Sequence, residues 1–249
     1  LKMKNIIISG INGKMGNYVY LSAKEQNLNV VCGVDKIKSE KTNCPVYSSL
    51  EEITQTADVV IDFSSPSNLS GLLDYCVKTK TPLVVCTTGY SPEDENEISN
   101  AASAIPILKT ANTSLGVSLF IKNVADTAAK LPDYDIEIVE KHHKTKKDSP
   151  SGTAKRIINS LLKIKQNADI VYGRKGENAR TNGEIGVHSV RGGSVVGEHT
   201  VYFFGKNDYI SITHSALDKK LFSDGAIEAA RFITTKTKGL YSEKDLFEF

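Results

Sequence analysis

Two patterns of apolar and polar positions divide this sequence. Up to about residue 113, short apolar runs alternate with segments whose apolar residues recur at helical spacing. The runs lie at 6–8, 29–34, 59–63, 83–86 and 105–109, and the helical segments at 14–26, at 68–78 and from about 92. Repeated alternation of strand and helix predicts a parallel sheet with helices on both faces, whose ligands bind beyond the carboxyl ends of the strands.

From about residue 114 the pattern favours longer strands. After one helical stretch, apolar runs predict strands at 136–139, 185–190, 195–204 and 209–215. Gly192-Gly193 and the segment 205–208 predict hairpin turns between the last three strands. We therefore expect a second, α+β domain with an open, mostly antiparallel sheet, followed by a helix at 222–235 that returns to the first domain. The predicted domains are 1–113 completed by 222–249, and 114–221.

A glycine-rich turn follows the first predicted strand and leads directly into a helix: Gly10-Ile11-Asn12-Gly13-Lys14-Met15-Gly16. Glycine permits positive φ and a close approach of the backbone to a pyrophosphate, and the helix N-terminus favours an anion. The spacing G-x-x-G-x-x-G differs from the usual G-x-G-x-x-G, so the turn alone is a weak signal. Together with the acid that ends the second strand, it predicts a nicotinamide dinucleotide site.

That acid is Asp35, about 20 residues beyond the turn, where a carboxylate commonly binds the adenosine ribose. Its neighbour Lys36 could instead meet a ribose 2′-phosphate. A carboxylate disfavours that phosphate and an ammonium attracts it, with energies of similar size. The cofactor is therefore expected to be NADH or NADPH, and the sequence leaves the preference open.

The segment 140–153, E-K-H-H-K-T-K-K-D-S-P-S-G-T, carries the densest chemistry. His142 and His143 can supply or orient a proton near neutral pH, and Lys146 is a cationic donor. Ser151-Gly152-Thr153 lies where the next helix is predicted to begin, so its backbone N–H groups could receive a carboxylate or phosphate. Lysine-rich loops are also commonly solvated surface, but the independent dinucleotide signal favours an active-site loop for a small anionic substrate.

Composition supports a soluble enzyme. The 249 residues are 40% hydrophobic and carry a formal charge of +2, too near balance to indicate a nucleic-acid partner. No apolar stretch reaches the roughly 20 residues needed to span a bilayer, and no signal peptide precedes the first strand, so we expect no membrane partner and a cytoplasmic location. The cysteines lack metal-ligand spacing, so we expect no metal site and reduced core thiols at Cys32, Cys44, Cys76 and Cys86.

Six segments together resemble the 4-hydroxy-tetrahydrodipicolinate reductase family, also called the dihydrodipicolinate reductases, over nearly the whole chain. The segments are 10–16, 62–66, 87–89, 111–117, 140–153 and 191–200. Of these, the pattern E-x-H-H-x-x-K-x-D-x-P-S-G-T is highly specific to the family. The resemblance implies a Rossmann-like doubly wound domain and a second domain that binds substrate and forms a homotetramer through its sheet.

The resemblance also implies an activity. Hydride from NADH or NADPH would reduce a cyclic, unsaturated dicarboxylate with loss of water from the 4-hydroxy substrate, giving tetrahydrodipicolinate in diaminopimelate and lysine biosynthesis. The family's catalytic positions match His142 and Lys146, with Lys146 favoured as the proton donor, and its substrate contacts match His143, Gly152 and Thr153. Its cofactor contacts match Gly10, Ile11, Asn12, Gly13, Lys14, Met15, Asp35, Lys36, Cys86, Thr87, Thr88, Thr110, Ala111, Asn112 and Thr113.

Some positions stay open. Family members commonly have glycine where this chain has Cys86, and a side chain there could crowd the cofactor. Arg191 and Glu198 match family positions too, but a role in the sheet or a subunit interface is as plausible as a substrate contact. The remaining histidines lie on predicted strands, where a hydrogen-bonded structural histidine is the more common outcome: His188, His199 and His214.

Two other functions fit parts of the sequence. A different two-domain nicotinamide oxidoreductase acting on an amino-acid precursor would share the glycine-rich turn, but has no reason to place His-His-x-x-Lys before Ser-Gly-Thr. A non-catalytic module that senses NAD(H) could use the basic loop to bind a regulatory partner. Replacement of His142 or Lys146 separates an enzyme from a sensor, because only an enzyme loses turnover while it keeps cofactor binding.

Overall fold

The computed structural model describes residues 3–36 and 42–247, and its contacts divide the chain into two compact units. Unit 1 comprises Leu1–Ser114 and Lys220–Phe249, and unit 2 comprises Leu115–Lys219. The crossings differ by one or two residues from the predicted 113/114 and 221/222. The ends of the predicted first domain, residues 1–2 and 248–249, lie outside the described residues, as does 37–41.

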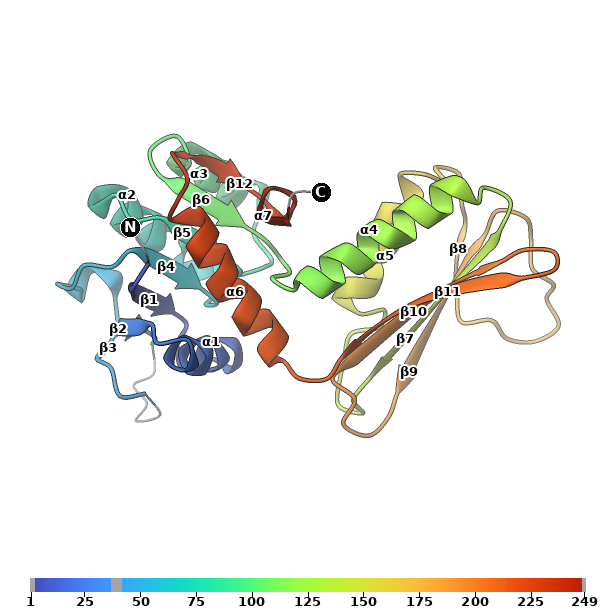
Figure 1. Cartoon of the computed structure of the whole chain (residues 1–249), viewed down its shortest axis with the longest axis horizontal. Helices are drawn as coiled ribbons and strands as arrows, with labels where there is room; N and C mark the ends of the chain where they lie inside the picture. The colour runs from blue at the N-terminus through green and yellow to red at the C-terminus, as the bar shows by residue number, and fades with distance from the viewer. Residues whose placement is uncertain (1–2, 37–41, 248–249) are drawn as a thin grey trace. The chain divides into compact units, whose positions relative to one another are not determined.

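Unit 1 is built on a seven-stranded sheet in which every recorded pairing is parallel. In order across the sheet the strands are β12 (Gly239–Tyr241), β6 (Pro106–Lys109), β5 (Leu83–Val85), β4 (Val59–Asp62), β1 (Asn5–Ser9), β2 (Asn29–Val34) and β3 (Val46–Tyr47). Its helices are α1 (Lys14–Glu25), α2 (Leu69–Thr79), α3 (Pro92–Ala101), α6 (Lys220–Ile233) and α7 (Glu243–Phe247), with 3-10 turns η1 (Leu50–Glu52) and η2 (Pro66–Asn68). The predicted doubly wound parallel sheet is confirmed (Figure 1).

Burial on both faces explains why the central strands are continuously apolar. Ile6 and Ile8 of β1 lie in a hydrophobic cluster with residues of α1 and α6, whereas Ile7 lies in a second cluster with residues of α2 and α3. Successive side chains of a strand point to opposite faces, so an uninterrupted apolar run is what a doubly covered parallel strand requires. Helix α6 contributes Ala226 and Ile227 to the first cluster, as predicted for the returning helix at 222–235.

Unit 2 contains a five-stranded mixed sheet. Its order is β11 (Tyr209–Ala216), β10 (Gly197–Phe204), β7 (Asp135–His142), β9 (Ile185–Arg191) and β8 (Ile170–Tyr172). Strand β10 is antiparallel to β11 and β7, and β9 is parallel to β7 and β8. Helices α4 (Leu115–Lys130) and α5 (Gly152–Leu162) pack on one face of the sheet through a single hydrophobic cluster (Figure 1).

One predicted hairpin of unit 2 is wrong. Strands β9 and β10 are not neighbours, because β7 lies between them, so Gly192-Gly193 does not join a hairpin. The turn instead passes around the end of β7: the Gly192 N–H donates to the carbonyl of His142 at 3.0 Å, and the Lys144 N–H donates to the carbonyl of Gly193 at 3.2 Å. The second predicted hairpin, 205–208, is confirmed by the pairing of Phe204 with Tyr209.

Within residues 3–36 and 42–247, no helix has the length and apolar character that crossing a bilayer requires.

Candidate functional site

The glycine turn, residues 10–16, is shaped by close backbone approach. Gly10 has φ +77°, and a Cβ there would lie 2.5 Å from the carbonyl oxygen of Phe63. A Cβ on Gly16 would lie 2.0 Å from the carbonyl oxygen of Gly10. Gly13 is the N-cap of α1 and provides no capping side chain. The turn therefore brings backbone close to the start of α1 and leaves it without a capping side chain, a shape that fits a pyrophosphate.

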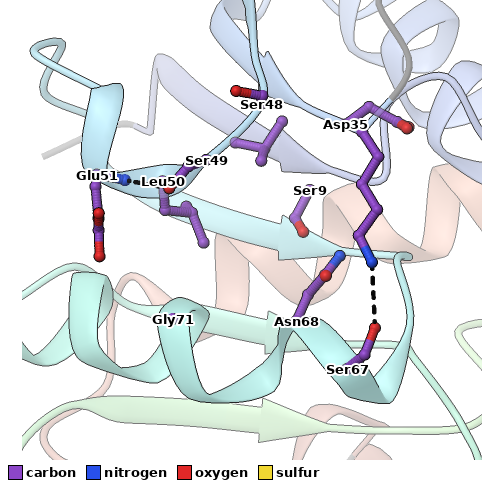
Figure 2. Close-up of a pocket in the computed structure, with 11 residues that line it drawn as sticks. Ser9, Asp35, Ser48, Ser49, Leu50, Glu51, Ser67, Asn68 and Gly71 are labelled. Carbon is purple, nitrogen blue, oxygen red and sulfur yellow. Dashed lines mark hydrogen bonds between the residues drawn. The ribbon is translucent and has the colours of Figure 1, made fainter.

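Asp35 is tied to this turn. Its carboxylate accepts a hydrogen bond from the Asn12 N–H at 3.0 Å, and the Lys36 Nζ lies 3.5 Å from the Ser67 Oγ (Figure 2). A cavity of about 220 Å³ lies beside them at the carboxyl ends of β1 and β2. It is lined by Ser9, Val34, Asp35, Lys36, Ser48, Ser49, Leu50, Glu51, Ser67, Asn68 and Gly71. Its hydroxyls, carboxylate and ammonium suit a ribose or a ribose phosphate.

A buried carboxylate organises the turn after β4. Asp62 is fully buried and accepts hydrogen bonds from the Ser64 hydroxyl at 2.6 Å and from the Thr87 hydroxyl at 2.6 Å. Thr88 is exposed next to this network. Cys86 is 8% exposed and belongs to the hydrophobic cluster shared with α1 and α6, where burial raises the pKa of its thiol well above the ordinary value. The thiol at this position therefore contributes mainly to packing.

The segment 110–113 follows β6. The Thr110 hydroxyl lies 2.6 Å from a carboxylate oxygen of Glu243, and the Thr113 hydroxyl donates to the carbonyl of Phe222 at 2.5 Å. The Asn112 side chain donates to the carbonyl of Ser114 at 3.1 Å, and Ala111 is exposed. Elements from the C-terminal part of the chain thus hold this segment, a role of Glu243 that the sequence did not indicate.

In unit 2, the chemistry begins on one face of β7. The side chains of Ile136, Ile138, Glu140 and His142 alternate with more exposed neighbours and point to the helix-covered face. The two isoleucines fill the core, whereas Glu140, fully buried, accepts from both terminal nitrogens of Arg191 at 2.7 and 2.8 Å. The face therefore changes from apolar to ionic toward the carboxyl end of the strand.

His142 is 8% exposed and bonded to that carboxylate. Its Nδ1 lies 2.5 Å from a carboxylate oxygen of Glu140, and its ring packs edge-on against His199 with centroids 5.1 Å apart. Burial lowers the pKa of His142, against the opposing effect of its hydrogen bond to the Glu140 carboxylate, and the charges of Lys146 and Arg191 lower it further. The imidazole is therefore neutral near pH 7.

The histidine loop, residues 143–151, connects β7 to α5. The Lys146 Nζ lies 2.7 Å from a carboxylate oxygen of Asp148, and the Lys146 side chain is 20% exposed. The Asp148 carbonyl accepts from Arg191 at 2.7 Å, which links the loop to the buried ion pair. His143 is half-buried, with its Nδ1 2.8 Å from the Thr145 hydroxyl. The loop places a lysine ammonium and an imidazole beside His142.

The start of α5 completes this region. Ser151 is the N-cap: its hydroxyl accepts from the Ala154 N–H at 3.1 Å and lies 2.7 Å from the Nε2 of His199. Within residues 3–36 and 42–247, the N–H groups of Gly152 and Thr153 meet no hydrogen-bond acceptor. Two backbone donors at a helix N-terminus suit a carboxylate.

The other histidines of unit 2 have protein partners. His199 is 4% exposed, and burial is the main cause that lowers its pKa to about 4. The Nε2 of His188 lies 2.7 Å from a carboxylate oxygen of Glu137. The ring of His214 lies 6.1 Å from that of Phe120. Such partners are typical of structural histidines.

Comparison with known families identifies the family in which these features occur together. The family model described as "Dihydrodipicolinate reductase, N-terminus" matches residues 4–113, and the model described as "Dihydrodipicolinate reductase, C-terminus" matches residues 116–247. The chain belongs to the dihydrodipicolinate reductase family. Both of its units, and both groups of candidate residues, therefore lie in regions characteristic of the family.

Curated relatives span the whole chain. The 4-hydroxy-tetrahydrodipicolinate reductase of Caldanaerobacter subterraneus subsp. tengcongensis is 46% identical over 248 residues, covering 98% of this chain and 98% of the relative. The enzyme of the same name from Clostridium tetani is 42% identical over 243 residues, covering 96% and 95%. A dipicolinate-bound dihydrodipicolinate reductase from Paenisporosarcina sp. has the same fold, with a TM-score of 0.82, 22% identity and 98% coverage of both chains.

The residues predicted from the dihydrodipicolinate reductase resemblance separate by unit. Every predicted cofactor residue lies in unit 1, and His142, His143, Lys146, Gly152 and Thr153 lie together in unit 2. The backbone of Ser151 belonged to the predicted anion-binding helix start, whereas the sequence indicated no individual role for Glu140 or for the cavity serines. The period-two pattern of β7 could have indicated Glu140, because it places an acid on the strand's buried face.

Proposed function

We propose that this chain is an NAD(P)H-dependent 4-hydroxy-tetrahydrodipicolinate reductase, which reduces its cyclic dicarboxylate substrate with loss of water to tetrahydrodipicolinate. Membership of the dihydrodipicolinate reductase family and the names of the full-length relatives support the reaction class. The observation that carries the substrate class is the start of α5, where the N–H groups of Gly152 and Thr153 meet no acceptor among the described residues. These donors suit one carboxylate of a dicarboxylate.

The cofactor would be held by unit 1. The glycine turn fits the pyrophosphate because no Cβ is tolerated at Gly10 or Gly16, and Asp35 beside its cavity fits the adenosine ribose. Thr87, Thr88 and residues 110–113 would border the nicotinamide end. When bound, the reduced nicotinamide supplies the hydride.

Residues of unit 2 would manage protons and substrate charge. Reduction of a conjugated imine moves negative charge toward the ring nitrogen, so a cationic donor lowers the barrier, by about 10²- to 10⁴-fold for general acid catalysis. Lys146 is that donor in this proposal, and Asp148 orients its ammonium. His142 accepts or relays a proton, and His143 contacts a substrate carboxylate.

Both NADH and NADPH are proposed as cofactors. Asp35 would accept hydrogen bonds from the ribose hydroxyls of NADH, and Lys36 with Ser67 would meet the 2′-phosphate of NADPH. Because Asp35 and Lys36 carry opposite charges, we propose no strong preference for either cofactor.

A homotetramer is proposed through the open face of the unit 2 sheet. Tyr202, Phe204 and Tyr209 form a contiguous aromatic group on that face, and Phe204 and Tyr209 are 40% and 62% exposed. Aromatic side chains are enriched at protein interfaces, and large exposed groups of them are uncommon on monomers. Light scattering on the purified protein measures the assembly directly.

The test is oxidation of NADH and of NADPH, followed by absorbance, with the condensation product of aspartate semialdehyde and pyruvate supplied freshly by its synthase. Substrate-dependent loss of reduced cofactor supports the reductase, and the two rates give the preference. Binding of both cofactors without oxidation would contradict it and would favour the sensor or a different substrate.

A further inference from the structure

We infer that Glu140 is a positioning residue that holds the imidazole of His142 as its Nδ1–H tautomer, so that Nε2 presents a lone pair rather than a proton. The inference rests on the proposed function, because it concerns how His142 acts in that reaction. In this inference the Nε2 of His142 is the proton acceptor and Lys146 is the proton donor.

The first argument is the free-energy cost of burying the Glu140 carboxylate. The carboxylate is fully buried on the β7 face that also carries Ile136 and Ile138. An unpaired buried charge is strongly destabilising, and an apolar residue would fill the face more simply. Arg191 of β9 therefore pairs this buried charge: its guanidinium donates bidentate hydrogen bonds to both oxygens of Glu140.

The second argument is the ionisation state that this pairing imposes. Burial alone would raise the pKa of Glu140, but hydrogen bonds from Arg191, Ser189 and His142 outweigh burial and lower the pKa to about 2. The carboxylate is therefore ionised near neutral pH. An ionised carboxylate can only accept hydrogen bonds, so the Nδ1 of His142, 2.5 Å away, must carry the proton that is donated.

The third argument concerns the opposite side of the ring. Because His142 is neutral near pH 7 and its proton lies on Nδ1, Nε2 has a lone pair. The backbone of β10 faces this atom with Gly197, and a Cβ there would lie 3.0 Å from Nε2. Glycine thus leaves the accepting nitrogen uncrowded, while His199 packs edge-on against the ring and fixes its plane.

Glu140 also connects His142 to the start of α5. The oxygen that faces Arg191 Nη2 accepts the Ser151 N–H at 3.2 Å, directly before Gly152 and Thr153. One carboxylate therefore orients the imidazole and the helix start proposed to bind a substrate carboxylate. Acid–imidazole pairs of this kind set the tautomer and direction of a catalytic histidine in other enzymes.

The experiment compares two isosteric variants. Glu140→Gln keeps size but can donate its amide N–H to Nδ1, which converts His142 to the Nε2–H form. Glu137→Gln is the matched control: Glu137 lies on the same strand, on the other face, and also bonds an arginine and a histidine, Arg180 and His188. The full chain is labelled with 15N-histidine, and the His142 signals are assigned with His142→Asn.

The expected wild-type spectrum shows His142 as Nδ1–H. In Glu140→Gln it changes to Nε2–H, kcat falls by about 10²- to 10⁴-fold, and the Kd for NADH stays within about twofold. Glu137→Gln retains both the His142 tautomer and kcat. A merely structural role for Glu140 would lower thermal stability without changing the tautomer.

Three results would overturn the inference: an Nε2–H ring in the wild type, an unchanged tautomer in Glu140→Gln, or a changed tautomer with normal kcat. The wild-type spectrum decides the first even if the variant does not fold. Failure of the proposed function is distinguishable, because a wild type that holds His142 as Nδ1–H but oxidises neither cofactor contradicts the reaction and not the tautomer.

Discussion

The glycine turn of unit 1 and the histidine loop of unit 2 both receive an anion in the proposed enzyme, but they are built differently. In the glycine turn, fit comes from missing side chains, since a Cβ at Gly10 or Gly16 would collide with backbone oxygens. Around the histidine loop, fit comes from side chains whose charges are buried and paired, with Glu140 and Arg191 at the centre. Binding therefore depends on steric space in the glycine turn and on protonation states around the histidine loop.

Because the two regions are built differently, substitutions in each should have different effects. Changes in the glycine turn should act through packing and cofactor affinity, with little dependence on pH. Changes around the histidine loop should act through turnover and through the pH dependence of stability. Four experiments test this separation, in order of decreasing expected effect.

Lys146→Ala tests the chemical side most strongly. Loss of the proposed proton donor should lower kcat by about 10²- to 10⁴-fold, while the Kd for NADH, measured by fluorescence titration, stays unchanged. Lys147→Ala removes an exposed neighbouring cation and should keep at least half of wild-type activity. Equal losses in both variants would show that the loop acts through net charge alone.

His199 should make stability depend on pH. Burial lowers its pKa to about 4, so as pH falls below 6.5 the unfolded chain binds a proton that the native ring does not. The free energy of unfolding should therefore fall by about 3 kcal/mol between pH 6.5 and 4 from this group, measured by urea denaturation. His199→Gln should have a shallower pH dependence across that window. Parallel curves for the two proteins would contradict this.

Gly16→Ala tests the packing side. Its Cβ would lie 2.0 Å from the Gly10 carbonyl oxygen, so we expect a loss of about 1–3 kcal/mol in stability and weaker NADH binding. Gly71→Ala is the control for stability alone, because Gly71 lines the ribose cavity but occupies the same third position of its helix, α2, with no atom within 4 Å of a Cβ. There alanine should stabilise by about 0.5–1 kcal/mol. Similar melting temperatures for both variants would show that close approach does not limit the turn.

The smallest expected effects concern cofactor choice. Asp35→Asn should weaken NADH binding by about 5- to 10-fold, since a charged hydrogen bond becomes neutral. Lys36→Ala should weaken NADPH binding by a similar factor and leave NADH unchanged, because only the 2′-phosphate meets this ammonium. Isothermal titration of both cofactors measures this. A loss for NADH in Lys36→Ala would contradict the assignment.

Much of unit 1 could be predicted from the sequence because local signals agree there. The run at 29–34 matches β2 residue for residue, and the helix predicted near residue 92 begins at Pro92 behind a Ser91 capping box. Short connections in a βα alternation leave few topologies. Unit 2 was harder to predict. The Gly192-Gly193 turn has the composition of a hairpin turn, but β7, which lies about fifty residues earlier in the sequence, lies between β9 and β10, the two strands that the turn connects.

Local periodicity, turn chemistry and a specific motif in the sequence were sufficient to predict the family, the doubly wound sheet and the residue types at the glycine turn and histidine loop. Which charged side chains pair with one another became known only from the three-dimensional fold. The bond between Glu140 and Arg191 and the contact of His199 with Ser151 join residues about fifty positions apart. Such contacts depend on strand order and register, which no local pattern encodes, and they set the protonation state of His142.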